Sequence, residues 1–259
     1  MSKFSELNDR LNEFLKLNTP PVAIKLFKSA EEMKKYVKRR PRNKIALCQM
    51  LGQSRYIGRV LGGTAKELDS CALGVAVLGF TDYPEDIAEG KRFKGLYHKN
   101  EEISKKVFAE TPRFEVGVFE GILSSPLSKS PIEPDLIIFF GNSAQIARIV
   151  HGYVYGTGER LVFSTSGEAA CADAIIPPIL TGKPSITLPC NGARILSAVQ
   201  DSEMIISVPM LSIESIIEGM KKTHEGGIRY PPTFQITYVS PQPPVSHFIG
   251  MKPPNQENR

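Results

Sequence analysis

Leu136-Ile-Ile-Phe-Phe140 is a run of five apolar residues, and the turn Gly141-Asn142 and a helical segment opening with Ser143-Ala144 follow it. A short apolar run bounded by turn residues is typical of a strand buried on both faces. The same order occurs earlier, where Val22-Ala-Ile-Lys-Leu-Phe27 leads through Ser29-Ala30 into another helical stretch. Two strand-to-helix units of this kind predict an α/β protein.

Each unit is followed by two of the chain's four cysteines, namely Cys48 and Cys71, then Cys171 and Cys190. Beyond the second cysteine of each pair, Glu85-Asp-Ile-Ala-Glu-Gly90 matches Glu214-Ser-Ile-Ile-Glu-Gly219, and we expect both segments to follow a strand. The repeated order predicts two duplicated α/β halves that share one core about a pseudo-twofold axis.

The expected organisation is an N-terminal helix in residues 1–19, a first half in 20–125, a second half in 133–240 and a proline-rich tail in 241–259. The small, apolar run 71–79 predicts a buried strand. Residues 114–124 and 233–239 are further strand candidates and possible counterparts. We therefore expect a mixed sheet, or two related sheets, with an antiparallel component.

Composition limits the class of protein. With 259 residues, 41% of them hydrophobic, the chain can bury a sizeable core. It has no apolar run of about 18 residues and does not begin like a signal peptide, so we expect a cytoplasmic protein without a membrane span. The thiols of such a protein stay reduced, which favours ligands, nucleophiles or core residues over disulfides.

The net charge of +5 comes largely from a basic stretch, residues 34–44. A nucleic-acid interface would need aromatic residues between the basic ones, or a known binding module, and Tyr36 is the only aromatic residue here. The stretch therefore argues against nucleic acid. It is either solvated surface or a docking site for an acidic partner.

The four cysteines are the candidate metal ligands. Two thiolates from each half would meet across the pseudo-twofold axis and bind an iron–sulfur cluster or, alternatively, one zinc ion. No local Cys-x-x-Cys supports this interpretation. The competing interpretation is that cysteine, a small and often buried residue, merely packs where these elements meet.

A second candidate site is the turn at Gly141, Asn142 and Gln145, where free N–H groups of a helix N-terminus would hold a phosphate or carboxylate. An ordinary capped strand-to-helix connection is the alternative. Arg194, one turn beyond Cys190, is a candidate for binding the same anion or for lowering the pKa of that thiol. Glu168 and Asp173 flank Cys171 and are candidate proton carriers or helix-dipole partners.

Several of these segments resemble the uncharacterised ArCR-type family, a domain of unknown function found mainly in anaerobic bacteria and archaea. The resemblance rests on 133–145, 166–172, 188–194 and 201–209, and it covers most of residues 20–230. It implies that the cysteine-centred segments are signature positions of the family. The family has no established activity, so the resemblance implies no reaction for this chain. The chain departs from the expected pattern at Ser143 and at Ala72-Leu73-Gly74.

Three functions remain open from the sequence. The first is a cysteine-ligated iron–sulfur or metal protein, a redox or sulfur-handling enzyme whose partner is a small anionic molecule or an electron-transfer protein. The second is an enzyme or binding protein for a small phosphorylated or carboxylated molecule, without metal, that uses the 141–145 turn and at most one reactive cysteine. The third is a non-enzymatic module that binds an acidic partner through residues 34–44.

Overall fold

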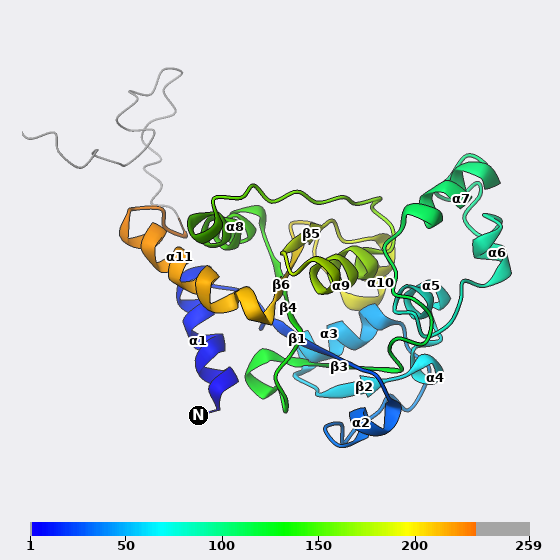
Figure 1. Cartoon of the computed structure of the whole chain (residues 1–259), viewed down its shortest axis with the longest axis horizontal. Helices are drawn as coiled ribbons and strands as arrows, with labels where there is room; N and C mark the ends of the chain where they lie inside the picture. Colours follow the sequence, from blue (N-terminus) through cyan, green and yellow to red (C-terminus); the bar gives the residue numbers. More distant parts are fainter. Residues whose placement is uncertain (1, 232–259) are drawn as a thin grey trace, which may run out of the picture.

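A six-stranded sheet lies at the centre of the structure, and helices cover both of its faces (Figure 1). The computed structural model describes residues 2–231. The strands are β1 (Val22–Phe27), β2 (Leu61–Gly63), β3 (Gly121–Pro126), β4 (Leu136–Gly141), β5 (Ser185–Thr187) and β6 (Met204–Pro209). Their order across the sheet is β2-β3-β1-β4-β6-β5, so each half of the chain supplies three adjacent strands.

Every neighbouring pair in this sheet is antiparallel, which corrects the expectation of a mixed sheet. The two halves meet where β1 and β4 pair, with Val22 opposite Ile138 and Ile24 opposite Leu136. Alternation of strands and helices along a chain leaves strand direction open. Here the direction of the strands is set by the pairing of β1 with β3 and of β4 with β6. The alternation does not specify these long-range pairings.

Two helical layers enclose the sheet. One contains α3 (Leu47–Ile57), α5 (Ala72–Val77), α9 (Ala170–Thr181) and α10 (Asn191–Ser197), and the other contains α1 (Lys3–Leu15), α8 (Ser143–Thr157) and α11 (Ile213–Glu225). Successive residues of β4 point to opposite faces of the sheet. Ile138 and Phe140 pack into the core beneath the first helical layer, and Ile137 and Phe139 pack into the core beneath the second.

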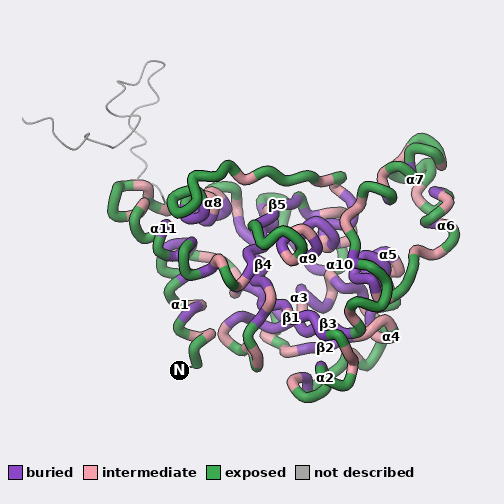
Figure 2. The backbone as a smooth tube through the Cα atoms, viewed as in Figure 1, coloured by how far each residue is buried: buried purple, intermediate pink, exposed green. Residues whose placement is uncertain are grey.

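The remaining elements are short or peripheral. They are α2 (Ala30–Lys34), α4 (Ala65–Leu68), α6 (Glu85–Ala88), α7 (Glu101–Glu110) and the 3₁₀ turns η1 (Leu127–Lys129) and η2 (Met210–Ser212). The segment with α6 and α7 extends away from the sheet (Figure 1). Figure 2 shows that the central strands are buried, whereas the connection from α8 to α9 is largely exposed. Within residues 2–231, no helix is long and apolar enough to cross a membrane.

Three expectations for local structure need correction. Residues 71–79 are not a strand, because 72–77 form α5, a short helix buried in the first core. Consequently α6, at Glu85–Ala88, follows a helix, whereas α11 follows β6 and η2, so the match between 85–90 and 214–219 does not join equivalent elements. The strand expected at 114–124 begins only at Gly121. The strand expected at 233–239 lies outside the described residues, as does the tail 241–259.

Candidate functional site

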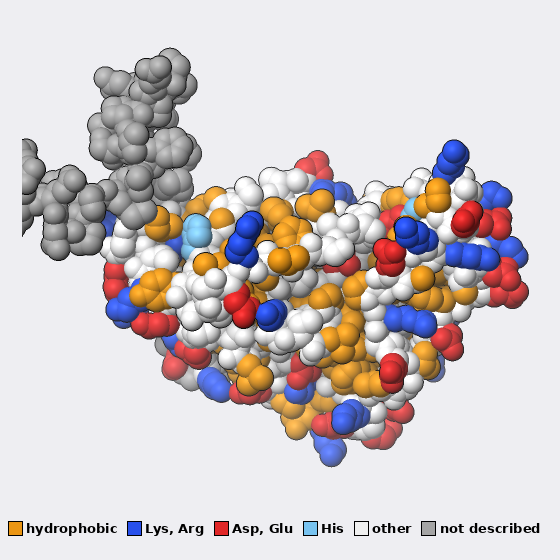
Figure 3. All heavy atoms as spheres, turned by 45° about the horizontal axis from the view of Figure 1, so that its top comes forward, with side chains coloured by type: hydrophobic (Ala, Val, Ile, Leu, Met, Phe, Trp, Pro, Cys, Tyr) orange, Lys and Arg blue, Asp and Glu red, His pale blue; other side chains and the backbone are white. Residues whose placement is uncertain are grey.

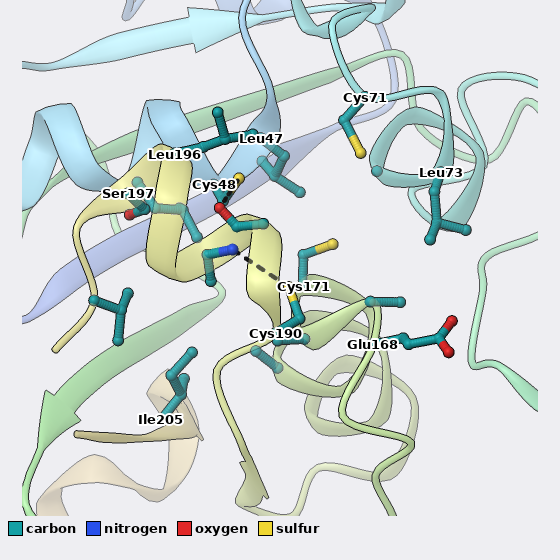
Figure 4. A pocket seen from close by; sticks show the side chains of 18 of the residues that line it. Leu47, Cys48, Cys71, Leu73, Glu168, Cys171, Cys190, Leu196, Ser197 and Ile205 are labelled. Carbon is teal, nitrogen blue, oxygen red and sulfur yellow. Dashed lines mark hydrogen bonds between the residues drawn. The ribbon is translucent and has the colours of Figure 1, made fainter. Parts of the chain in front are cut away.

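The four cysteines line one cavity of about 280 Å³ between the first helical layer and the sheet. In Figure 4 their side chains lie in the middle of this cavity, with Ser197 and Ile205 on one side and Leu73 and Glu168 on the other. The wall beyond the sulfurs is apolar and includes Ile138 and Phe140 of β4. All four cysteines are free thiols and are partly exposed to the cavity.

Each cysteine lies at the N-terminus of a different helix. Cys48 is the second residue of α3, and Cys171 is the second residue of α9. Cys71 precedes α5, and Cys190 precedes α10, as their N-cap residues. The first backbone N–H groups of a helix lack partners within the helix and carry a partial positive charge. Four helix starts therefore favour negative charge at the sulfurs.

Small residues and backbone groups surround the sulfurs. The N–H of Ala193 donates to Cys190 Sγ at 3.4 Å, and Cys48 Sγ donates to the carbonyl of Gly192 at 3.7 Å. A Cβ atom added at Gly74 would lie 3.7 Å from Cys71 Sγ, and one added at Gly192 would lie 3.8 Å from Cys190 Sγ. Both distances are ordinary van der Waals contacts, so the backbone of these two glycines lies close to the sulfurs.

Burial disfavours the ionised form of two of these thiols, Cys48 and Cys171. It raises the pKa of Cys48 to about 12, with further contributions from Cys190 and Cys71. It also raises the pKa of Cys171, and the other three cysteines add to that shift. With a raised pKa, the free thiols of Cys48 and Cys171 are protonated at neutral pH and are weak nucleophiles. A bound metal reverses this, because coordination deprotonates a thiol outright.

The spacing of the thiols limits what they can bind. In the part of the chain that the structure describes, no three His, Cys, Asp or Glu side chains lie close enough together to hold a single metal ion. A tetrahedral zinc site with Zn–S bonds of about 2.3 Å requires sulfurs about 3.8 Å apart. The ligand sulfurs of a four-iron cluster lie farther apart, roughly 6–7 Å, because the iron and sulfide atoms intervene.

One side of the cavity is formed by the segment between α6 and α7. Arg92, Phe93 and Tyr97 line the cavity from this segment, and Glu168 lines it from the stretch just before α9. His98 connects the two parts, with its Nε2 atom 2.9 Å from Glu168 Oε1. The sequence marked Glu168 as a candidate proton carrier, but it contained no signal for His98, which lies 70 positions away.

The second predicted site, at 141–145, does not line the cysteine cavity. Asn142 caps α8 by accepting from the N–H of Gln145, and Gln145 Oε1 accepts from the N–H of Asn142. The Gln145 side chain also donates to the carbonyls of Leu15 and Lys16 at the end of α1. Gly141 lies directly over Gln145, since an added Cβ would be 2.9 Å from Gln145 Oε1. In this structure the side chains of the turn hold two helices together.

Arg194 and Asp173 also have partners of their own. Arg194 pairs with Asp201 at 2.8 Å and does not line the cavity. Asp173 is buried on α9 and accepts from Thr187 at 2.9 Å. Of the two carboxylates beside Cys171, Glu168 is the one that faces the cavity.

Part of the basic stretch is neutralised locally. Lys34 pairs with Glu31, Arg40 with Glu67 and Lys44 with Asp69. Figure 3 shows charged side chains of both signs across one face of the molecule, with hydrophobic side chains gathered near its middle. The stretch therefore carries less unpaired charge than its sequence indicates.

Comparison with known proteins gives a family but no activity. Residues 10–219 match the family described as uncharacterised ArCR, a domain of unknown function. The uncharacterised protein MJ0308 of Methanocaldococcus jannaschii is 29% identical over 224 residues, which cover 85% of this chain and 95% of that protein. No solved structure matches the chain.

Proposed function

The chain belongs to the uncharacterised ArCR family, and we propose that it is a redox protein whose four cysteines, Cys48, Cys71, Cys171 and Cys190, bind a [4Fe–4S] cluster. The observation that carries this proposal is the meeting of all four thiols of the chain in one cavity. Chance packing of four isolated cysteines gives no reason for all of them to face the same space.

The position of each cysteine on its helix supports the same function. A cluster with four thiolate ligands carries a net negative charge, and four helix N-termini compensate for part of it. The free energy of cluster binding would also offset the free-energy cost of deprotonating the buried thiols of Cys48 and Cys171. With one ligand on each of four helices, the fold has to form before the site is complete.

A cluster suits the cavity better than one zinc ion does. Among residues 2–231 no three ligand side chains are grouped closely enough for a single ion, whereas a cubane takes one cysteine per iron and uses a wider spacing of its ligand sulfurs. A single tetrahedral ion would need the thiols to lie closer together than they do here. The cluster would provide one-electron chemistry at the wall of a cavity that also has Arg92, Tyr97 and Glu168 for a small molecule.

We also infer that the two halves arose by duplication and that the site lies on their shared pseudo-twofold axis. The strand order pairs β1 with β4 at the centre and places β3 and β2 in the positions mirrored by β6 and β5. Pro126 and Pro209 end equivalent strands, and a 3₁₀ turn follows each of them. The cysteines occupy matching helix positions, second residue and N-cap, in both halves.

The test is anaerobic purification followed by spectroscopy of the wild type and of four single Cys→Ser variants. The wild type is expected to absorb broadly near about 400 nm, where thiolate-to-iron charge transfer falls, and to bleach on reduction. Each variant should lose iron or bind an altered cluster. Ser197→Ala is the matched control, because Ser197 lines the same cavity without a sulfur, and it should keep the spectrum.

Two results would contradict the proposal. One is a folded, colourless wild type that stays colourless after reconstitution with iron and sulfide. The other is a Cys→Ser variant with the iron content and spectrum of the wild type, since four-cysteine ligation leaves no thiol to spare. The metal-free function based on the 141–145 turn has less support, because the side chains of that turn are engaged with α1.

A further inference from the structure

Glu168 is a buried carboxyl group with one free oxygen. Its exposed fraction is 7%, and it lines the cavity that holds the four cysteines. Glu168 Oε1 lies 2.9 Å from His98 Nε2, whereas Glu168 Oε2 is buried and has no hydrogen-bond partner. A buried polar atom without a partner is costly, so a group of this kind needs an explanation.

His98 continues the hydrogen-bonded chain away from the cavity. Its Nδ1 atom lies 3.0 Å from Ser104 Oγ on α7, and its ring packs edge-on against Phe108. Ser104 is buried, and the side chain of His98 is almost fully buried. The three side chains form a buried path, Ser104–His98–Glu168, that ends at the cavity. Hydrogen-bonded histidine and carboxyl groups of this kind transfer protons.

Few other ionisable groups face Glu168. Arg92 and Tyr97 line the cavity from the segment between α6 and α7, and Arg92 is already paired with Asp86. The four thiols line it from α3, α5, α9 and α10. Burial raises the pKa of Glu168, while the neighbouring His98 lowers it, and the net shift is upward. The carboxyl group is therefore easier to protonate than one in water.

We propose that Glu168, held by its hydrogen bond to His98, is the proton carrier of this cavity and takes up one proton for each electron that enters the cluster. This inference rests on the proposed [4Fe–4S] cluster. One electron from an external one-electron reductant and one proton from solvent convert the oxidised cluster and the Glu168 carboxylate into the reduced cluster and the Glu168 carboxylic acid. The cluster gains one negative charge, and the protonated carboxyl loses one, so the net charge of the cavity does not change.

The coupling has a definite sign. A reduced cluster is more negative and favours the protonated carboxyl, so low pH favours reduction and the reduction potential falls as pH rises. In the coupled range the reduction equilibrium changes tenfold per pH unit, which is about 59 mV for a one-electron couple. The glutamine of Glu168→Gln does not ionise, so the reduction potential of this variant should be independent of pH. At high pH it should lie above the potential of the wild type, whose Glu168 is then a negative carboxylate.

The experiment is a potentiometric titration of the anaerobically purified protein from about pH 4.5, the ordinary pKa of a glutamate side chain, to about pH 9, followed by absorbance and electron paramagnetic resonance. The wild type, Glu168→Gln, Glu168→Asp and Asp173→Asn are compared, each with iron and sulfide measured first. Asp173→Asn is the matched control, because Asp173 is a buried carboxyl five residues after Glu168, on α9, that is bonded to Thr187 and does not line the cavity. Glu168→Asp keeps a carboxyl group and should keep a pH-dependent potential.

The expected result is a pH-dependent potential in the wild type, Glu168→Asp and Asp173→Asn and a pH-independent one in Glu168→Gln. A pH-independent potential in iron-containing wild type overturns this inference alone, as does an unchanged slope in Glu168→Gln. Loss of iron in Glu168→Gln also overturns it, because Glu168 would then be a residue that holds the site together. Wild type without iron or sulfide overturns the cluster proposal and this inference with it.

Discussion

Gln145 provides a quantitative test of the second predicted site, because the structure gives its side chain a structural role. Replacing Gln145 with alanine removes three hydrogen bonds, two donated to the carbonyls of Leu15 and Lys16 and one accepted from the N–H of Asn142. The side chain is 2% exposed, so little water is available to replace these partners. With about 1 kcal/mol for each bond, Gln145→Ala should lower the free energy of unfolding by about 3 kcal/mol.

Gln49 is the matched control. It occupies the same position in the first turn of α3, and its side chain has one hydrogen bond in the structure, accepted from the N–H of Ala46 at 2.7 Å. Gln49→Ala should therefore cost only about 1 kcal/mol. Urea unfolding followed by circular dichroism measures both values on protein purified in the same way.

The refuting result is a Gln145→Ala variant that is destabilised no more than Gln49→Ala. Such a result would mean that the bonds to the end of α1 contribute little. If that variant also lost binding of inorganic phosphate or acetate that the wild type showed, the turn would be an anion site, as the sequence suggested.

Three further substitutions test local features of the fold. Gly219→Ala should destabilise the protein by about 1–3 kcal/mol, because the new Cβ would lie 2.2 Å from the carbonyl oxygen of Gly152 where α8 crosses α11; an unchanged urea midpoint would contradict this. Lys16→Gly should stabilise it by about 1 kcal/mol, since Lys16 ends α1 in a left-handed conformation with φ of 48°, and a lower melting temperature would count against that reasoning. Burial acts to raise the pKa of Glu67, but hydrogen bonds from Thr64 lower it overall. The wild type should therefore be more stable than Glu67→Gln above about pH 5, and this difference in the free energy of unfolding should disappear as pH falls below the normal pKa of about 4.5. A difference that grows on acidification would refute this prediction.

Local patterns predicted the elements that depend on neighbouring residues. The strand at 22–27 is confirmed, and Ser29 caps α2 by accepting from the N–H of Glu32. The strand at 136–140 extends by one residue, to Gly141. In each case the apolar run and the turn after it are contiguous in sequence.

The errors arose where one pattern fits two structures. The run 71–79 is small and apolar throughout, and such a run suits a buried strand or a buried helix equally well. The structure forms helix α5 there, and all of its residues from Leu73 to Val77 are buried, so the helix has no polar face that would have revealed it. At 114–120 the alternation belongs to a loop in which Phe114 packs against Phe119.

The candidate site shows the same limit. The paired order of the cysteines suggested that they meet, whereas the pairing of Glu168 with His98 depends on the position of the segment between α6 and α7. That segment lies in one half only, between α5 and β3, so no repeat pointed to it. Contacts between residues far apart in sequence are set by tertiary packing, and a single sequence does not reveal them.

The most direct test of cluster binding is a crystal structure of the anaerobically purified protein with anomalous data at the iron edge. Four-cysteine ligation predicts one strong iron peak in the cavity, resolvable into four iron atoms, each bonded to the Sγ atom of one of Cys48, Cys71, Cys171 and Cys190. A cavity without an iron peak in folded, reconstituted protein, or iron bound elsewhere on the chain, would contradict it.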